Sequence, residues 1–349
     1  MKKMKYYIVT NRQILDNNGI EQIDITNSGV CIDNLRFATF DSLSSNPDSY
    51  VLLPDKSKID SEPYYFNINE PVKKGSERFF TELTHEMQDE GGDLLVLIHG
   101  FNVNWIEGIN YLRSLEKIFI NSKTSTIKHL VLISWPSRAS ILRYKLDTLD
   151  AVLCGTTIGR CFQLFYKFLN EAFTGYPGLK PCRHKVHLLC HSMGTFVLEN
   201  MLKTILSDGA RYHHVFDEVI LAAADVDNTI FEEPNPFYYL NKLSRRVHIY
   251  CNRNDLVLKY SAKYENLRTR LGTNGPANID ALPNRVYVVD CTDASFNRGP
   301  GLQGRLIQHA YYLDVPRVSA DINAVLQGME PDQIEHRTQI NQVKYRLKP

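Results

Sequence analysis

The sequence predicts a doubly wound α/β fold, in which a mostly parallel sheet carries helices on both faces. From about residue 77 onwards, short continuous apolar runs alternate with longer stretches of helical periodicity. This alternation is typical of parallel strands that are buried on both sides. The apolar runs expected as strands are 93–98, 129–133, 186–189, 218–223, 247–250 and 286–289. The stretches expected as helices are 79–87, 104–112, 149–173, 196–206 and 318–326.

The first two expected helices have recognisable ends. Gly91 and Gly92 follow the first helical pattern and end it before the strand at 93–98. Asn104, with Glu107 three residues later, has the spacing of a capping box and therefore begins the second helix. The residues expected on the core side of that helix are Ile106, Ile109 and Leu112.

Three regions differ in pattern. Residues 1–75 contain extended patterns separated by Asn, Asp, Ser and Pro, which indicates either edge strands of the main sheet or a β-rich extension. Residues 76–330 form the α/β domain. Residues 331–349 are polar and weakly periodic, so we expect a loosely docked C-terminal tail.

Composition excludes several classes of function. With 349 residues, 43% of them hydrophobic, the chain can bury a large core. Forty basic residues nearly balance thirty-nine acidic ones, so no net field attracts nucleic acid, and no nucleic-acid partner is expected. No apolar run is long enough for a transmembrane segment or a signal-peptide core. Seven cysteines without a C-x-x-C pair indicate reduced thiols and a cytoplasmic location.

The most informative motif is the segment 185–194, where an apolar strand pattern runs through Ser192 into a helical one. A sharp turn between a strand and a helix holds a serine hydroxyl out of the backbone ladder, which is the geometry of a nucleophile elbow. Cys190 stands where the first glycine of the usual G-x-S-x-G pattern would be, and a thiol is small enough to fit there. Ser192 is therefore the candidate nucleophile.

A serine nucleophile needs a base and an acid. His309 follows the last expected strand through a glycine-containing loop, which is where the base belongs in an open α/β sheet. Asp255, after the strand 247–250, is the favoured acid that would orient the imidazole. Asp225 and Asp227, after the preceding strand, remain alternatives to Asp255; otherwise they cap the next helix.

The developing negative charge on the substrate needs two backbone donors. One is the N–H of Met193, directly after the nucleophile, and the other is the N–H of Phe101 in the loop after the strand 93–98. His99 in that loop is interpreted as a structural hydrogen-bonding residue. His191 is interpreted as packing or support for the elbow.

These motifs together resemble a bacterial lipase-like family of the α/β-hydrolase superfamily whose function is unknown. The resemblance implies the triad Ser192, Asp255 and His309, a catalytic domain at 76–330, and hydrolysis through an acyl-enzyme without a metal or an organic cofactor. It does not imply a substrate. The segments that carry the resemblance are LVLIHGFN (95–102), ISWP (133–136), LLCHSMG (188–194), AAADVD (222–227), NDL (254–256) and HAYY (309–312).

Substrate selection is expected from loops, because the segment 225–246 is too short for a large lid. Aromatic and basic side chains in these loops are candidates for the substrate pocket, although they could equally pack the loops or lie in solvent. The candidates are Trp135, Arg138, Arg143, Tyr144 and Phe231.

The leading hypothesis is a serine hydrolase of carboxylic esters, acting on a lipid or small acyl ester. The same residues could instead cleave a thioester, an amide or a phospholipid. A second class of hypothesis is a binding or scaffold protein that has kept the fold without the chemistry.

Overall fold

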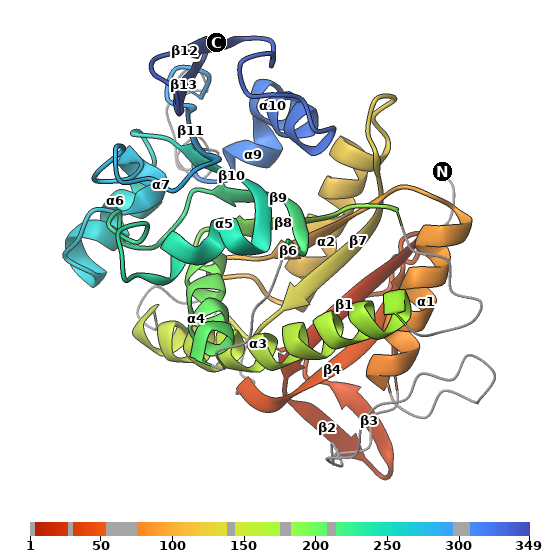
Figure 1. Ribbon diagram of the computed structural model, residues 1–349. Coiled ribbons are helices and arrows are strands. Elements are labelled where there is room, and N and C mark those ends of the chain that lie inside the picture. The colour runs from red at the N-terminus through yellow and green to blue at the C-terminus, as the bar shows by residue number, and fades with distance from the viewer. Residues whose placement is uncertain are drawn as a thin grey trace.

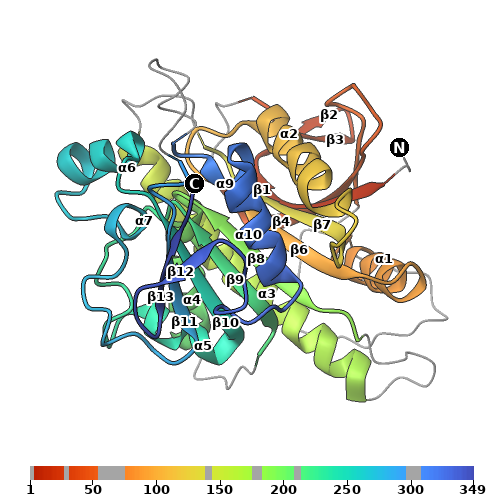
Figure 2. The same ribbon diagram turned by 90° about the horizontal axis from the view of Figure 1, so that it is seen from above.

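The computed structural model describes residues 4–26, 31–53, 75–137, 144–174, 183–207, 214–295 and 308–349 (Figure 1). A mixed sheet of eleven strands lies at the centre of these residues, in the order β12-β13-β11-β10-β9-β8-β6-β7-β1-β4-β5. Helices pack on both faces of this sheet (Figure 2). The predicted doubly wound α/β fold is confirmed.

All six apolar runs expected as strands are strands of the sheet, and they form its continuous parallel middle from β7 to β11. Their carboxyl ends therefore meet at one edge of the sheet. The strands are β1 (Lys5–Arg12), β4 (Cys31–Asp41), β5 (Tyr50–Leu52), β6 (Asp93–Ile98), β7 (Ile127–Ser134), β8 (Val186–His191), β9 (Phe216–Ala222), β10 (Ser244–Cys251), β11 (Val286–Asp290), β12 (Arg337–Gln339) and β13 (Lys344–Leu347).

Two apolar cores lie on the two faces of the sheet, because successive strand residues point to opposite sides. Leu94 and Ile98 of β6 belong to the core beneath α1, α3 and α4, whereas Leu95 and Leu97 belong to the core beneath α2 and α10. The described helices are α1 (Gly75–Asp89), α2 (Trp105–Leu115), α3 (Tyr144–Thr174), α4 (Gly194–Ser207), α5 (Leu240–Leu243), α6 (Leu256–Tyr260), α7 (Leu271–Asn274), α9 (Tyr311–Asp314) and α10 (Pro316–Leu326). Short π-helical turns η1 (Glu116–Ile120) and η4 (Ser261–Glu265) follow α2 and α6, and a 3-10 turn, η3 (Pro236–Tyr239), precedes α5. In the part of the chain that is described, no helix combines the length and apolarity needed to cross a bilayer.

The capping box at the start of α2 is confirmed. The Asn104 side chain accepts a hydrogen bond from the Glu107 N–H, and the Glu107 carboxylate accepts one from the Asn104 N–H. The expectation that Ile106 faces the core is wrong, because its side chain is exposed. Trp105 occupies that core position instead, and its indole N–H donates to the Pro47 carbonyl at 3.0 Å.

The described N-terminal residues add strands to the sheet edge and form a separate hairpin. β1 pairs in parallel with β7, and β4 and β5 continue the sheet in antiparallel fashion. A separate hairpin, β2 (Ile14–Asn17) with β3 (Ile20–Ile23), projects from this edge.

The expectation of a loosely docked tail is wrong for the described end of the chain. β13 pairs in parallel with β11, and β12 adds antiparallel to β13. A buried ion pair between Arg337 and Asp321 of α10, at 2.7 Å, anchors β12, and the Asp321 carboxylate also accepts a hydrogen bond from the Tyr250 hydroxyl at 2.6 Å. The alternation of polar and buried residues along β13 is short, which is why the segment resembles a polar tail in sequence.

Candidate active site

Ser192 lies at the sharp turn between β8 and α4, with a backbone φ of 52°. This left-handed conformation is unfavourable for a serine, and four hydrogen bonds hold it, one of them from the Asp225 N–H to the Ser192 carbonyl at 3.2 Å. The Ser192 N–H donates to the Ala222 carbonyl at 3.0 Å, and the Ser192 carbonyl accepts from the N–H and the hydroxyl of Thr195 at 3.0 and 2.6 Å. Cys190 is fully buried in the core, so the elbow forms with a thiol at the position of the first glycine.

Two glycines bring the loop after β6 against this elbow. A Cβ placed on Gly100 would lie 2.8 Å from the Cβ of Ser192 and 3.0 Å from the His191 carbonyl oxygen. A Cβ on Gly194 would lie 2.4 Å from the Ile98 carbonyl oxygen. The 2.8 Å and 2.4 Å separations are shorter than a side chain tolerates. The backbone on either side of Gly100 therefore runs beside Ser192 because residue 100 has no side chain.

Asp255 and His309 meet at the carboxyl edge of the sheet. The Nδ1 atom of His309 lies 2.7 Å from Oδ2 of Asp255. Oδ1 of the same carboxylate accepts the Leu258 N–H at 3.0 Å, so Asp255 is also the N-cap of α6. The aspartate side chain is fully buried, and its two oxygens have two different partners.

The carboxylate changes the acidity of His309. Burial lowers the pKa of His309, but the charge of Asp255 and its hydrogen bond outweigh burial and raise the pKa above the ordinary histidine value. The charge of Asp225 also raises the pKa of His309, to a smaller extent. The imidazolium form of His309 is therefore stabilised in the folded protein.

Four hydrogen bonds fix the segment that carries His309. The Asn252 amide donates to the Gln308 carbonyl at 3.1 Å. The Tyr311 hydroxyl donates to the Tyr250 carbonyl at 2.7 Å and accepts the Ala223 N–H at 3.0 Å, so α9 is joined to the ends of β9 and β10. The Nε2–H of His191 lies 3.3 Å from the His309 carbonyl oxygen, and the two rings are 4.9 Å apart.

His191 and His99 have the supporting places that the sequence indicates. His191 precedes Ser192, and burial first, then the nearby His309, lowers its pKa well below the ordinary value. His99 is buried and its Nε2 accepts the Trp135 N–H at 3.1 Å, so its Nδ1 carries the proton and donates to the Gly100 carbonyl at 2.9 Å. Burial lowers the pKa of His99 to about 3. Both rings are therefore neutral at ordinary pH.

Sequence reasoning missed two residues that hold the loop after β6. Arg12, at the end of β1, is fully buried, and its guanidinium donates to the Val103 and Trp135 carbonyls at 3.0 and 2.8 Å. Ser137 accepts the Asn102 N–H at 2.6 Å and donates to Asp147 of α3 at 2.9 Å. A charged residue at the end of the apolar run in β1 was the only sequence signal for Arg12.

The two backbone N–H groups expected as oxyanion donors, those of Met193 and Phe101, each lie next to a residue of the close contact between Gly100 and Ser192. Met193 directly precedes Gly194, the first residue of α4, and the first N–H groups of a helix lack intrahelical partners and attract negative charge. Phe101 follows Gly100, whose backbone is packed on Ser192, and its side chain is partly buried against the core.

The alternative acids have other partners. Oδ1 of Asp225 accepts a hydrogen bond from the Ser261 hydroxyl at 2.7 Å. Asp227 pairs with Arg268 at 2.9 Å and accepts the Thr229 N–H at 3.2 Å, so it caps a turn, and no helix begins there. It is Asp255 that the structure brings to His309.

The five candidate pocket residues fall into two groups. Trp135 and Phe231 are buried; the Trp135 indole N–H donates to the His99 carbonyl at 3.0 Å, and Phe231 packs on Phe237 with ring centroids 5.5 Å apart. Tyr144 begins α3, but its side chain lies outside the described residues, as do Arg138 and Arg143 entirely.

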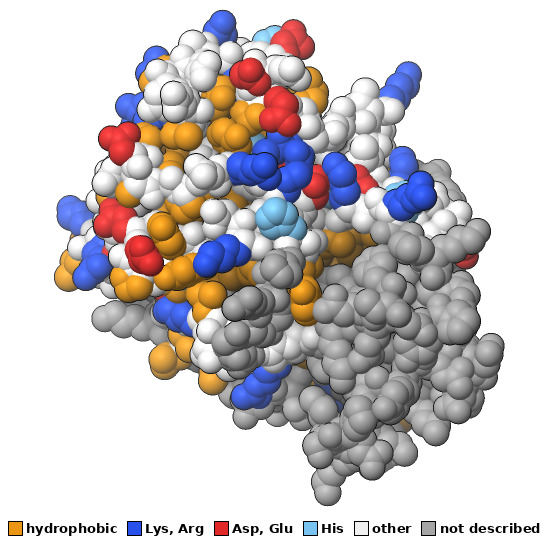
Figure 3. All heavy atoms as spheres, in the orientation of Figure 1, with side chains coloured by type: hydrophobic (Ala, Val, Ile, Leu, Met, Phe, Trp, Pro, Cys, Tyr) orange, Lys and Arg blue, Asp and Glu red, His pale blue; other side chains and the backbone are white. Residues whose placement is uncertain are grey.

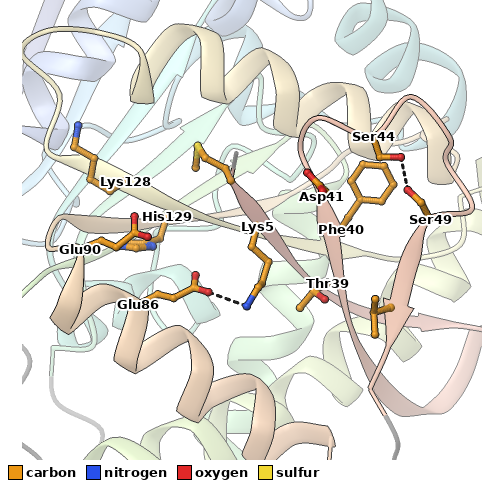
Figure 4. Close-up of a pocket in the computed structure, with 12 residues that line it drawn as sticks. Lys5, Thr39, Phe40, Asp41, Ser44, Ser49, Glu86, Glu90, Lys128 and His129 are labelled. Atoms are coloured by element: carbon orange, nitrogen blue, oxygen red, sulfur yellow. Dashed lines mark hydrogen bonds and ion pairs between the residues drawn. The ribbon is translucent and has the colours of Figure 1, made fainter. Parts of the chain in front are cut away.

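A cavity of about 590 Å³ lies away from this site (Figure 4). It is lined near the amino ends of β1 and β7 by Lys5, Lys128 and His129, and by Glu86 and Glu90 at the end of α1. Lys5 and Glu86 point toward each other across it and form an ion pair at 2.8 Å. Since the parallel strands place Ser192 and Asp255 at the opposite edge of the sheet, this cavity is not part of the candidate site.

Comparison with known proteins agrees with the fold. No protein with curated annotation matches the chain at a significant level. A family model described as an alpha/beta hydrolase of unknown function matches residues 76–327, which include Ser192, Asp255 and His309. The chain therefore belongs to this family of α/β hydrolases of unknown function.

Proposed function

We propose that the protein is a serine hydrolase that cleaves carboxylic esters of lipids or small acyl groups through an acyl-enzyme. The observation that carries the proposal is the 2.7 Å contact between His309 Nδ1 and Asp255 Oδ2, beside an elbow that holds Ser192 at a φ of 52°. A buried carboxylate on Nδ1 fixes the proton there and leaves Nε2 of the neutral ring free to accept a proton.

In the proposed reaction, His309 takes the hydroxyl proton as Ser192 Oγ attacks the ester carbonyl carbon. The resulting oxyanion is stabilised by the N–H groups of Met193 and Phe101, each contributing about 3 to 4 kcal/mol in the transition state. When the tetrahedral intermediate collapses, the bond to the alcohol breaks and His309 gives its proton to the leaving oxygen. A water then attacks the acyl-enzyme by the same route and releases the acid.

Substituting the nucleophile tests the proposal. Ser192→Ala should abolish turnover of a p-nitrophenyl ester while the thermal unfolding curve stays intact. Ser207→Ala, the same change at the exposed end of α4, is the matched control and should retain turnover. Unchanged turnover in Ser192→Ala would overturn the assignment.

A covalent probe separates an enzyme from a scaffold that has kept only the fold. A fluorophosphonate should add to the peptide that contains Ser192, as detected by mass spectrometry, because only an activated serine reacts quickly. Folded protein without that adduct would favour the scaffold. The rates of hydrolysis of a panel of esters, thioesters, amides and phospholipids then identify which type of bond the protein cleaves.

The five cysteines whose side chains the structure describes support a reducing, cytoplasmic location as part of the proposal. Cys154, Cys161, Cys190, Cys251 and Cys291 are all buried free thiols. Buried thiols without disulfides are typical of proteins that work where glutathione keeps cysteines reduced.

A further inference from the structure

An exposed stripe of apolar and basic side chains runs along α6 and η4, directly after Asp255. Leu256, Tyr260, Tyr264 and Leu267 recur about every four residues, and all four are exposed. Leu258 and Ser261, between them, are buried. The segment therefore has one face in the body of the protein and one apolar face in solvent. We call the exposed face, formed by Leu256, Lys259, Tyr260, Lys263, Tyr264 and Leu267, the α6 stripe.

The stripe is aromatic and cationic. The Tyr260 and Tyr264 rings lie 5.0 Å apart, and the Lys263 ammonium lies 5.0 Å from the centre of the Tyr264 ring. Lys259 and Lys263 are exposed, and neither forms an ion pair with another residue of the described ranges. The single acidic residue between 256 and 267, Glu265, is only partly exposed.

Leu267 is the most prominent member of the stripe. Its side chain is 81% exposed, and its backbone φ is 55°, in the left-handed region that disfavours leucine. An apolar residue that is both strained and solvated contributes nothing to the folded core. The conformation and exposure of Leu267 therefore indicate a contact with something other than this chain.

The first turns of α3 extend the apolar surface on the same side of the molecule. Leu146, Leu149 and Leu153 recur along one face of α3, and all three are exposed. Figures 1 and 2 both place the start of α3 on the side of the molecule where α6 projects. Figure 3 shows hydrophobic side chains beside basic ones at the edge where Figure 1 places α6.

We infer that the α6 stripe docks on an anionic lipid surface. Tyrosine rings prefer the boundary between headgroups and acyl chains, leucine side chains insert below it, and lysines keep their ammonium groups among the lipid phosphates. The stripe projects at the periphery, so a flat bilayer can reach all of it at once. Its two unpaired lysines complement the negative charge of such a surface.

Docking there places the candidate site at the membrane. Asp255 caps α6, and its carboxylate holds His309, so the residues that contact the lipid begin one position beyond the proposed acid. This deepens the proposed function, on which it rests for its substrate: the esters that reach Ser192 come from the lipid surface. The docking itself does not depend on catalysis.

Vesicle binding tests the docking with an inactive chain. Full-length Ser192→Ala is sedimented with vesicles of phosphatidylcholine alone or mixed with phosphatidylglycerol. We expect binding to the phosphatidylglycerol vesicles, weakened by about 1 M salt. Lys259→Glu with Lys263→Glu should weaken binding at least about 25-fold, about fivefold for each lysine removed. Leu267→Ser should weaken it about tenfold.

Matched controls lie on other surfaces. Ile20→Ser removes an exposed apolar side chain from the β2–β3 hairpin. Lys117→Glu with Lys123→Glu reverses two exposed charges on η1 and the turn that follows it. These variants should bind vesicles as the parent does, with unchanged unfolding temperatures throughout. Equal binding by stripe variants and controls, or no binding by the parent, would overturn the docking. The docking would also be overturned if light scattering showed that the parent is a dimer and that the stripe variants are monomers, because a second copy of the chain would then cover the stripe.

Turnover separates this inference from the proposed function. In the active chain, the stripe variants should hydrolyse a soluble p-nitrophenyl ester like the parent but hydrolyse an ester embedded in phosphatidylglycerol vesicles more slowly. Equal loss on both substrates would overturn the docking role. An active Ser192→Ala chain would instead overturn the proposed function and leave the vesicle-binding result standing.

Discussion

Asp255 holds His309 with one carboxylate oxygen, at 2.7 Å, while its other oxygen caps α6. The position of the proposed acid is thus set by a helix end, and the orientation of the proposed base is set by the same side chain. An asparagine at this position can still cap a helix but carries no charge.

We expect Asp255→Asn to lower kcat/KM on the order of 10³- to 10⁴-fold with little change in stability, because the neutral amide does not hold Nδ1 in its protonated form. The measurement is steady-state hydrolysis of a p-nitrophenyl ester. Asp227→Asn is the matched control, since its carboxylate pairs with the exposed Arg268. A larger loss in Asp227→Asn than in Asp255→Asn would contradict the assignment of the acid.

The pH dependence follows from the raised pKa of His309. Only neutral His309 can accept the Ser192 proton, so kcat/KM should rise with pH along a limb centred above the ordinary histidine value of about 6.5. In Asp255→Asn, burial remains and the carboxylate charge is gone, so the limb should move to lower pH. A limb that moves upward in this variant would show that another group titrates.

Gly100→Ala should reduce turnover at least about 100-fold, because the added Cβ would lie 2.8 Å from the Cβ of Ser192 and displace the loop that carries Phe101. Gly19→Ala is the control. A Cβ at Gly19 meets no atom within 4 Å, so this variant loses only the stability associated with its φ of 84°. Equal turnover of the two variants would argue against the contribution of the Gly100 loop.

Cys190 should be chemically silent even though it lies two residues from Ser192. Burial raises the pKa of the Cys190 thiol well above its ordinary value, so no thiolate forms at neutral pH. Cys190→Ala should retain turnover, and iodoacetamide should leave the folded wild type active. Inactivation by iodoacetamide that Cys190→Ala resists would make the thiol part of the chemistry.

Arg337→Ala should lower the free energy of unfolding by about 3 to 5 kcal/mol, because it removes the only cation paired with the buried Asp321 carboxylate among the described residues and leaves it the Tyr250 hydroxyl alone. Arg346→Ala is the matched control on β13; its guanidinium is half exposed and lies 3.8 Å from Asp293, so its loss should cost about 1 kcal/mol or less. Urea denaturation compares the two. Similar values would mean that β12 contributes little to the fold.

The sequence predicted the parallel middle of the sheet well because its strands are continuous apolar runs. It also predicts Ser192 and His309 as candidate nucleophile and base, since strand order constrains where such residues can lie, and the structure places both beside the carboxyl edge of the sheet. The sequence favours Asp255 as the acid but leaves Asp225 and Asp227 as alternatives, because all three follow strands and only the folded chain brings one of them to His309.

Other features depend on contacts between segments far apart in the chain. Arg12 reaches the Trp135 carbonyl across 123 positions, and no local pattern records such a contact. β12 and β13 are three and four residues long and lie at one edge of the sheet. Such short strands need only one apolar face, so they do not form the continuous apolar runs that mark the central strands. Ile106 was misplaced because a spacing of three or of four residues before Ile109 fits a helical face equally well, and the folded chain buries Trp105 rather than Ile106.

Tyr250 links the C-terminal strands to the segment that carries His309, through its side chain and its backbone. Its hydroxyl donates to Asp321, the partner of Arg337, and its carbonyl accepts from Tyr311, two residues after His309. Synthesis on the ribosome proceeds from the N-terminus, so Ser192 and Asp255 emerge well before the strands that brace the histidine segment. His309 is made after both residues, so a half-made chain carries the Ser192 elbow before its proposed base exists.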